Sequence, residues 1–316
     1  MNTPRPDVSL IVVSLNSKAY LRGCLDSIYA ATWRNVTYEV VVTDNGSTDG
    51  TLEMLRDEYP QIGVLAQGRN LGFCPASNLG AVASQARYFM FLNDDIIVLE
   101  DAIAKLVEWM DEHPRAGSIG SRLLNIDGTD QFSSGRTWPT PMNALFARKS
   151  RLTKLFPNSK WSKRYLILDK CNTTEVYEVD WLSAAALLVR REAFYVAEKF
   201  DETYYYFHEL VFCERVQRAG YTNHLHPQSK IIHYEGAGSG LRTLRVRSKH
   251  IIAFHKGAYR WYCGFRRLGA YHPLRVPIAA MLAGRGAFLI CGEYVKTLTH
   301  RSPRLREKRP EGGVAL

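Results

Sequence analysis

Closely paired cysteines are absent from this sequence. Its six cysteines are widely scattered and include no CxxC pair, so neither a zinc knuckle nor a dense disulfide framework is indicated. The N-terminal residues run from a polar stretch straight into a strand-like run, without the basic, apolar and small-residue order of a signal peptide. Internal repeats and low-complexity tracts are missing as well. We therefore expect reduced thiols and a protein that stays in the cytoplasm.

The sequence does have the composition of a globular protein, with unevenly distributed charge. Its 316 residues are 46% hydrophobic and 23% charged, which suits a chain that buries a sizeable core. The net charge is +10, and residues 242–316 hold 16 Lys and Arg against 3 Asp and Glu, whereas the preceding residues hold 25 against 28. Such a basic segment is typical of binding to nucleic acid or anionic lipid, or serves solubility alone.

Strands and helices are predicted to alternate along most of the chain, around a loop-rich region at 126–179. Apolar β-rich runs predict the strands, and apolar residues at helical spacing predict the helices. Strands separated by helices indicate an α/β fold with a doubly wound, mostly parallel sheet. The expected strands are 8–15, 38–43, 63–66, 88–92, 181–189 and 230–234, and the expected helices are 20–31, 51–58, 76–85 and 212–219.

Polar residues follow each of the first four expected strands. In a parallel sheet the ligand lies beyond the carboxyl ends of the strands, so these residues form the candidate site. They are Asn16 after the first strand, Asp44 and Asn45 after the second, Arg69 and Asn70 after the third, and Asn93, Asp94 and Asp95 after the fourth.

The segment Asn93-Asp94-Asp95 has two interpretations. Carboxylates at a strand end can hold Mg²⁺ or Mn²⁺ against a diphosphate. Taken alone, such a segment more often forms a helix cap or an Asx turn. The resemblance carried by the motifs quoted in the next paragraph favours the metal site.

Six motifs in chain order carry a resemblance to a known family. They are VSLIVVSLNSKAYLRGCLDSI, VVTDNGSTDGT, RNLGFCPASNLGA, FLNDDI, WLSAAALLVRREAF and FHELVFCERVQRAGY. Together they cover about residues 8–240 and resemble the family 2 glycosyltransferases, with a specificity that no single motif has. The resemblance implies a GT-A fold, an inverting mechanism and a nucleotide-sugar donor.

The resemblance also implies donor-binding residues. Asp44 matches an aspartate that contacts the pyrimidine base, and Asn16 lines the same pocket. A carboxylate after a central strand can accept a hydrogen bond from a ring N–H or a ribose hydroxyl. The structural alternative is an Asx turn in the DNGSTDGT loop. The remaining donor-side candidates are Asn45, Arg69, Asn70, Asn93 and Asp94.

A divalent metal, Mg²⁺ or Mn²⁺, is the implied cofactor. Asn93 and Asp95 match the outer positions of the family's acidic motif, so Asp95 is the expected metal ligand. His233 in KIIHYEG follows the last expected strand and matches a histidine that completes the metal shell in relatives, although alone it reads as a core or turn histidine. Such chemistry uses a metal because the departing diphosphate carries charge that must be neutralised.

The catalytic base departs from the family pattern. Relatives show Glu-Asp before a helix with Cys and Arg, and alignment on Cys213 and Arg215 places Glu209 at the aspartate position and His208 at the glutamate position. Proton removal needs hydrogen-bond distance and a suitable pKa, so Glu209 is the expected base. The alternative is that Glu209 only favours the start of a helix and that the enzyme is altered.

The acceptor side is expected at Trp181 and Ser183, in a segment where Ala184 replaces the usual glycine and narrows the pocket. Trp181 has two interpretations, a platform for a sugar ring and a buried core residue. Rhamnose carried on dTDP is our first expectation for the donor. A polyprenyl-linked glycan of a cell-surface polysaccharide is the expected acceptor.

We expect two domains: residues 1–240, the GT-A nucleotide-sugar-binding and catalytic domain, and residues 241–316, a basic, aromatic-rich helical extension. The apolar stretch 276–291 contains Pro277 and Arg285 and is shorter than the roughly 20 residues of a spanning helix. The extension is therefore expected to lie on an anionic membrane surface. Nucleic-acid binding ranks lower, because no recognised module is present. Packing of the helices on the core is the third alternative.

Two other functions stay open at this point. The altered base motif also fits a non-catalytic protein that binds a nucleotide sugar or a glycan. A nucleotidyltransferase is less well supported, because its Gly-rich, Lys-containing phosphate loop is missing near the first strand.

Overall fold

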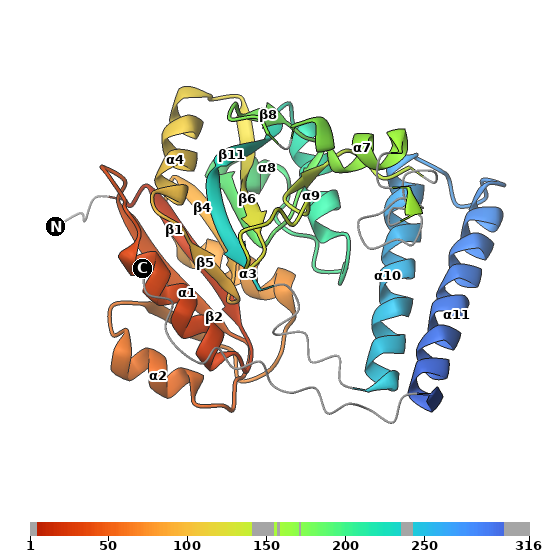
Figure 1. Ribbon diagram of the computed structural model, residues 1–316. Helices are drawn as coiled ribbons and strands as arrows, with labels where there is room; N and C mark the ends of the chain where they lie inside the picture. The colour runs from red at the N-terminus through yellow and green to blue at the C-terminus, as the bar shows by residue number, and fades with distance from the viewer. Residues whose placement is uncertain (1–4, 141–154, 157–158, 171, 235–242, 300–316) are drawn as a thin grey trace. The chain divides into compact units, whose positions relative to one another are not determined.

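The computed structural model describes residues 5–140, 155–156, 159–170, 172–234 and 243–299 (Figure 1). The chain divides into two compact units, Met1–Ser239 and Gly240–Leu316, which are described separately. Cys171 and parts of the expected extension, 241–242 and 300–316, lie outside the described residues. The other five cysteines are free thiols, as expected.

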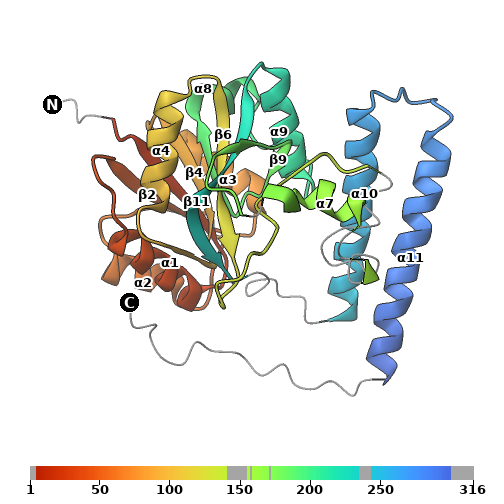
Figure 2. The ribbon, with the colours of Figure 1, turned by 45° about the horizontal axis from the view of Figure 1, so that its top comes forward.

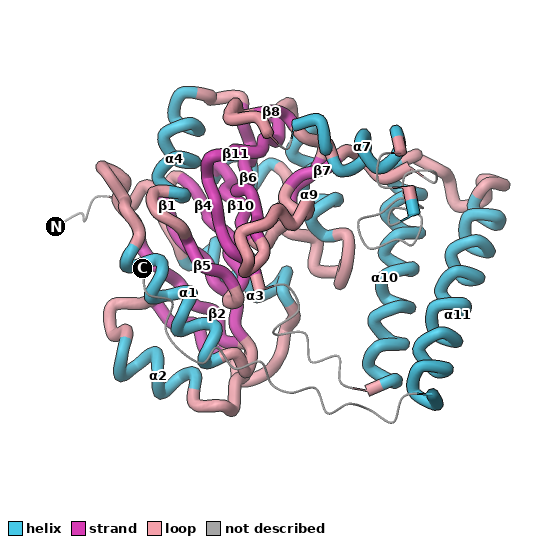
Figure 3. The backbone as a smooth tube through the Cα atoms, in the orientation of Figure 1, coloured by secondary structure: helices cyan, strands magenta, loops and turns pink. Residues whose placement is uncertain are grey.

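The first unit is built on a large sheet (Figure 3). Among the described residues nine strands join it, in the order β3-β2-β1-β4-β10-β6-β11-β5, with β8 paired to β11. β1, β2, β3, β4, β6 and β11 run in one direction, and β5, β8 and β10 run in the other. The strands are β1 Val8–Ser14, β2 Tyr38–Asp44, β3 Gly63–Ala66, β4 Tyr88–Asn93, β5 Ile96–Val98, β6 Ala116–Leu124, β8 Tyr177–Glu178, β10 Ala186–Arg190 and β11 Thr222–His233, while β7 Gly135–Arg136 and β9 Trp181–Leu182 pair separately.

Helices cover both faces of this sheet, because successive strand residues point to opposite sides. Leu10 and Met90 pack in one buried cluster with residues of α1, α2 and α4. Phe89 and Phe91 point to the other side, against the rings of Phe194 and Phe200. The helices α3, α8 and α9 lie on this side (Figure 2). The helices are α1 Lys18–Ala30, α2 Thr51–Glu58, α3 Phe73–Ala83, α4 Ala102–Glu112, α7 Lys160–Leu166, α8 Arg191–Val196 and α9 His208–Arg218, with a 3-10 turn η1 at Leu168–Lys170.

The expected mostly parallel, doubly wound sheet is confirmed, but the sequence pattern overlooked residues 96–124. This segment forms β5, α4 and β6. β6 is rich in small residues, so the sequence signal for a strand is weak there. The fold needs a small residue at Gly120, because a side chain at this position would lie 2.8 Å from Leu182. The expected strand at 181–189 is also divided into β9 and β10 by residues 183–185.

The second unit is an antiparallel pair of helices, α10 Leu244–Phe265 and α11 Arg275–Thr299. Arg285 donates to Nε2 of His255 at 2.9 Å, and Arg247 pairs with Glu293 at 2.9 Å. Pro277 lies in the first turn of α11, where proline is tolerated, so the helix continues through it. In the described residues α11 is the one helix long and apolar enough to cross a membrane.

Candidate active site

The strand register brings the predicted polar residues to one edge of the sheet. Ser14 at the end of β1 pairs with Asp44 at the end of β2, and Val13 pairs with Asn93 at the end of β4. Asp44 also pairs with Ala66, the last residue of β3. The loops that follow β1, β2, β3 and β4 therefore begin at the same edge of the sheet.

Asp44 is fully buried and its two carboxylate oxygens differ. Oδ2 accepts hydrogen bonds from the backbone N–H groups of Gly46 and Ser47, both at 3.0 Å. This is the Asx turn that was the structural alternative for Asp44. Within the described part of the chain, Oδ1 has no hydrogen-bond partner. Because an unpaired buried oxygen is costly, this atom is suited to accept from a ligand donor.

Asn16 and Asn45 hold the neighbouring loops. Asn16 has a φ of 51° and accepts from the backbone N–H of Thr48 at 2.7 Å through Oδ1. Asn45 is buried, donates to the carbonyl of Gly72 at 3.3 Å and accepts from the N–H of Leu71 at 3.4 Å. Both ends of its amide are thus used between two loops, so its contact with the donor stays a prediction.

Arg69 and Asn70 are exposed on the loop that follows β3. The backbone of this loop packs closely on Gly46, where a side chain would lie 2.8 Å from the nitrogen of Arg69. Gly46 also has a φ of 87°, so only glycine fits there without strain. The backbone of Arg69 therefore lies next to the Asp44 turn.

Asp94 and Asp95 lie between β4 and β5. Burial raises the pKa of Asp94 to about 7, the charge of Asp95 adds to the rise, and the hydroxyls of Ser14 and Ser17 oppose it. Asp95 is 6% exposed, and its Oδ1 has no hydrogen-bond partner among the residues that the structure describes. A cation would favour the charged form of these two close and poorly solvated carboxylates.

The pairing of β11 with β5 places His233 beside Asp95. His233 is opposite Ile96, and the N–H of Tyr234 donates to the carbonyl of Asp95 at 2.9 Å. Nε2 of His233 lies 3.4 Å from Oδ1 of Asp95 and 3.3 Å from Nδ2 of Asn93. The structure therefore brings the two expected metal ligands together, from positions far apart in the sequence.

These residues fit a divalent cation that is also held by its substrate. Among the described residues no three His, Cys, Asp or Glu side chains form a complete metal shell. Mg²⁺ and Mn²⁺ are commonly bound by one or two protein groups together with phosphate oxygens and water. The unpartnered oxygen of Asp95 beside an imidazole nitrogen supplies two such groups.

Glu209 lies in the first turn of α9, as the sequence predicted, with its side chain 23% exposed. Its carboxylate is 3.6 Å from Nε2 of His208, whose Nδ1 is buried without a partner. The His208 ring packs against Phe73, with 5.0 Å between ring centroids. Glu209 also raises the pKa of Cys74, after the larger effect of burial, so α9 and the start of α3 are neighbours.

The residues between β9 and β10 touch the acidic motif. The N–H of Asn93 donates to the carbonyl of Ala185 at 3.1 Å, and the Ser183 hydroxyl accepts from the N–H of Ala185 at 3.3 Å. Ser183 is partly exposed and Ala184 is buried. Ser183 is thus close to the end of β4.

Trp181 is a buried side chain, which is the structural alternative to a sugar platform. It is 8% exposed, its indole N–H donates to the carbonyl of Thr137 at 3.0 Å, and the Arg136 guanidinium lies 5.0 Å from its ring centroid. Its part in acceptor binding stays a prediction.

Asp180, next to Trp181, borders a cavity of about 260 Å³. Its Oδ2 accepts from the N–H of Trp138 at 2.6 Å, and burial raises its pKa. The cavity is lined by Thr137, Trp138, Thr140, Trp161, Arg164 and Asp180.

Sequence reasoning missed Gln131, a buried residue that contacts His233 at two points. It lies in the loop-rich region, outside any apolar period or quoted motif. The sequence contains no signal that distinguishes it from its neighbours.

Comparisons with known proteins agree with this arrangement. Residues 9–178 match the family described as glycosyl transferase family 2. The chain is 29% identical over 316 residues to the N-acetylglucosaminyl-diphospho-decaprenol L-rhamnosyltransferase of Mycobacterium tuberculosis. The alignment covers 96% of this chain and 97% of the relative.

Two solved structures share the fold at 16% identity. One is the mannosyltransferase PcManGT from Pyrobaculum calidifontis in complex with GDP-Man and Mn²⁺, with a TM-score of 0.53 over 94% of this chain and 81% of that one. The other is GalNAc-T7 with UDP, GalNAc and Mn²⁺, with a TM-score of 0.55 over 78% of this chain and 47% of that one.

The chain belongs to glycosyl transferase family 2. The resemblance seen in the motifs and the expected GT-A fold are thereby confirmed. The function is that of a glycosyltransferase that uses a nucleotide sugar, and the non-catalytic and nucleotidyltransferase alternatives are not favoured.

Proposed function

We propose that this glycosyltransferase moves a sugar, with rhamnose as the first candidate, from a nucleoside diphosphate to a hydroxyl of a polyprenyl-linked glycan, with inversion. The observation that carries the proposal is the edge of the sheet where Asp44, Asp95 and His233 present unpartnered or weakly partnered polar atoms. The full-length similarity to a rhamnosyltransferase that acts on a decaprenol-linked sugar supports the choice of substrates.

The donor is proposed to lie across the ends of β1, β2 and β4. Oδ1 of Asp44 accepts from the base, and the amide of Asn16 lines the same pocket. Arg69 is exposed and positively charged next to the Asp44 turn, which suits contact with the diphosphate. Asn45 supports the two loops, and Asn70, Asn93 and Asp94 complete the donor side.

Asp95 and His233 are proposed to hold Mg²⁺ or Mn²⁺. The cation supplies charge neutralisation for the departing diphosphate. Burial and the charge of Asp95 raise the pKa of the neighbouring Asp94 to about 7, so a bound cation would favour its ionised form. The two solved relatives with Mn²⁺ support a divalent cation without deciding between the two metals.

Glu209 is proposed to accept the proton of the attacking hydroxyl. Its carboxylate is partly exposed at the start of α9, so it can reach a substrate, and Nε2 of His208 lies 3.6 Å from it. A single displacement of this kind inverts the configuration at the sugar carbon. His208 and Asp180 are the next candidates should Glu209 prove inert.

The second unit is proposed to attach the enzyme to the membrane that carries the acceptor. Arg285 is the single charged residue from 276 to 292, and it is paired with His255 inside the helix pair. Val276 and Phe288 are each 73% exposed. Such exposed apolar residues beside basic ones are typical of helices that bind anionic bilayers.

A donor panel with membrane extract as acceptor tests the activity. Sugar release and transfer from dTDP-rhamnose, with both dependent on a divalent cation, is the expected result. Transfer from another nucleotide sugar would replace the proposed donor, and no transfer from any donor would reject the proposed activity.

Flotation with anionic liposomes tests the attachment. Phe288→Glu should reduce binding, because it places a charge in an exposed apolar face, whereas Val196→Glu, at an exposed apolar residue of the first unit, is the matched control. Equal flotation of wild type and both variants would argue against the helix pair as the attachment site.

A further inference from the structure

Gln131 bridges two groups of the proposed metal ligand His233. The residue is 2% exposed. Its Nε2 donates to the His233 carbonyl at 2.6 Å, and its Oε1 lies 3.1 Å from Nδ1 of His233. The Ser133 hydroxyl donates to the same Oε1, also at 3.1 Å.

These contacts determine which imidazole nitrogen carries the proton. A backbone carbonyl can only accept, so the NH₂ group of Gln131 must face it, and Oε1 must then face the ring. An amide oxygen can also only accept, so Nδ1 of His233 carries the proton. Nε2 of the neutral ring is therefore left with its lone pair.

The lone pair on Nε2 faces the acidic motif. Nδ2 of Asn93 donates a long hydrogen bond to it at 3.3 Å, and Oδ1 of Asp95, which has no donor among the described residues, is 3.4 Å away. The lone pairs of Nε2 and Oδ1 repel each other at this separation, and a cation between them would turn that repulsion into attraction.

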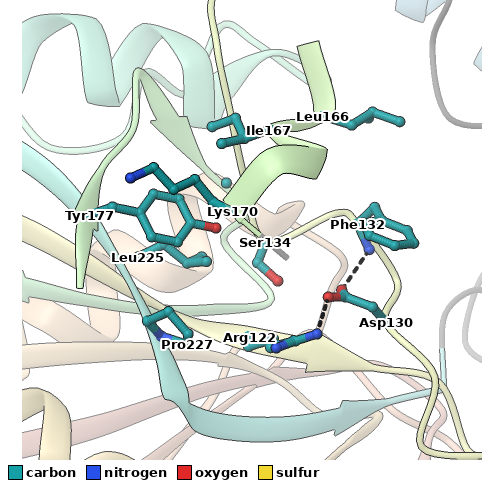
Figure 4. A pocket seen from close by; sticks show the side chains of 11 residues that line it. Arg122, Asp130, Phe132, Ser134, Leu166, Ile167, Lys170, Tyr177, Leu225 and Pro227 are labelled. Carbon is teal, nitrogen blue, oxygen red and sulfur yellow. Dashed lines mark hydrogen bonds and ion pairs between the residues drawn. The ribbon is translucent and has the colours of Figure 1, made fainter. Parts of the chain in front are cut away.

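The loop that carries Gln131 is held from several sides. Asp130 forms an ion pair with Arg122 at 2.8 Å and accepts from the N–H of Phe132 at 3.0 Å (Figure 4). The N–H of Gln131 donates to the carbonyl of Leu123 at 3.0 Å. The amide is thus placed before any ligand arrives, which is how a supporting residue gains its effect.

We propose that Gln131 is a positioning residue, which holds His233 in the Nδ1–H tautomer with Nε2 directed at a divalent cation beside Asp95. The inference rests on the metal role proposed for His233. Metal-bound histidines commonly donate their other N–H to a buried acceptor, and loss of that acceptor weakens metal affinity by about 10- to 100-fold.

The first experiment needs no metal. ¹⁵N NMR of metal-free protein, with His233 assigned by comparison with His233→Gln, reports which ring nitrogen carries the proton. We expect a protonated Nδ1 in wild type and a shift towards the Nε2–H form in Gln131→Met. A protonated Nε2 in the neutral ring of wild type would overturn the inference, as would an unchanged tautomer in the variant.

The second experiment measures Mn²⁺ binding by electron paramagnetic resonance. Gln131→Met should lower the affinity about 10- to 100-fold. Ser134→Ala is the matched control, because Ser134 is buried in the same loop and accepts from the N–H of Leu123 without touching His233. Equal losses in both variants would show that loop stability alone matters, and this would reject the positioning role.

The two proposals can fail separately. If His233→Ala binds Mn²⁺ as wild type does, the proposed metal role of His233 fails. The tautomer measurement then still decides whether Gln131 orients the ring.

Discussion

The ends of β2 and β4 both carry buried aspartates, yet they differ in how far the protein satisfies them. At β2, the Asp44 turn receives two backbone N–H groups and is tied to the next loop through Asn45. At β4, Oδ1 of Asp95 has no donor among the described residues, and the His233 imidazole lies 3.4 Å away. Asp44 also keeps one unpartnered oxygen, but its other oxygen is satisfied by the backbone. We propose that a cation completes the second end.

The comparison separates residues whose hydrogen bonds hold the site together from residues that keep a polar atom available for a ligand. A side chain whose hydrogen bonds are all made within the protein affects stability when it is removed. A side chain with an unsatisfied buried atom affects binding or catalysis. Four substitutions, in decreasing order of expected effect, test this distinction.

Asp95→Ala should abolish transfer and leave the fold intact, because Oδ1 of its carboxylate has no hydrogen-bond partner among the described residues. Transfer assays in Mg²⁺ or Mn²⁺, with circular dichroism as the fold check, measure this. Asp49→Ala is the matched control: its carboxylate already accepts from Lys18 and Thr51, so it should lose stability and keep metal dependence. Full wild-type turnover in excess chelator would contradict the metal assignment.

Glu209→Gln should cut transfer by about 10²- to 10⁴-fold, the usual contribution of a positioned general base, without changing donor affinity. Glu209→Asp should keep part of the activity, since the carboxylate is retained at a shorter reach. Single-turnover rates with saturating donor separate the two variants. A wild-type rate for Glu209→Gln would leave His208 or Asp180 as the base.

Asp44→Asn should raise the KM for the donor about 10- to 100-fold with little change in kcat. The asparagine oxygen can still accept from Gly46 and Ser47, while an NH₂ group replaces the unpartnered oxygen. Loss of a contact present in ground and transition states alike changes KM rather than kcat. An unchanged KM would mean that Asp44 serves only its turn.

Asn45→Ala should lower the free energy of unfolding by about 1 to 2 kcal/mol, because two buried hydrogen bonds between loops are lost. Urea denaturation measures the change, and the donor KM should rise less than in Asp44→Asn. A larger effect on donor affinity than on stability would place Asn45 in direct contact with the donor.

Sequence patterns predicted the strand ends that carry the proposed donor residues better than the other parts of the candidate site. β1, β2 and β4 are continuous apolar runs, so the apolar pattern alone places Asp44, Asn93 and Asp95 at strand ends. The residue beside Asp95, His233, was predicted only through the family resemblance. The pairing of β5 with β11 joins segments that are far apart in the sequence and share no local pattern. Gln131 could not be found, since its contacts arise from loop geometry alone.

In the C-terminal extension, the sequence pattern underestimated how far the apolar helix continues. Pro277 and Arg285 were expected to interrupt the apolar stretch, but Pro277 lies in the first turn of α11 and Arg285 is paired with His255. Hydropathy counts each residue by itself, whereas the position within a helix and the partner across it determine whether a proline or an arginine is disruptive.

The pairing of β11 with β5 also bears on how the chain folds. Asn93 and His233 are 140 residues apart in sequence, and their meeting requires the last strand of the sheet to be in place. Closing so long a loop is slow compared with forming the local units around β1 and β2. A nascent chain that lacks β11 would hold the acidic motif without its histidine. If Asp95 and His233 hold the proposed cation, divalent cations should stabilise the complete first unit more than such an intermediate, and cation-dependent stability would then measure the completion of folding.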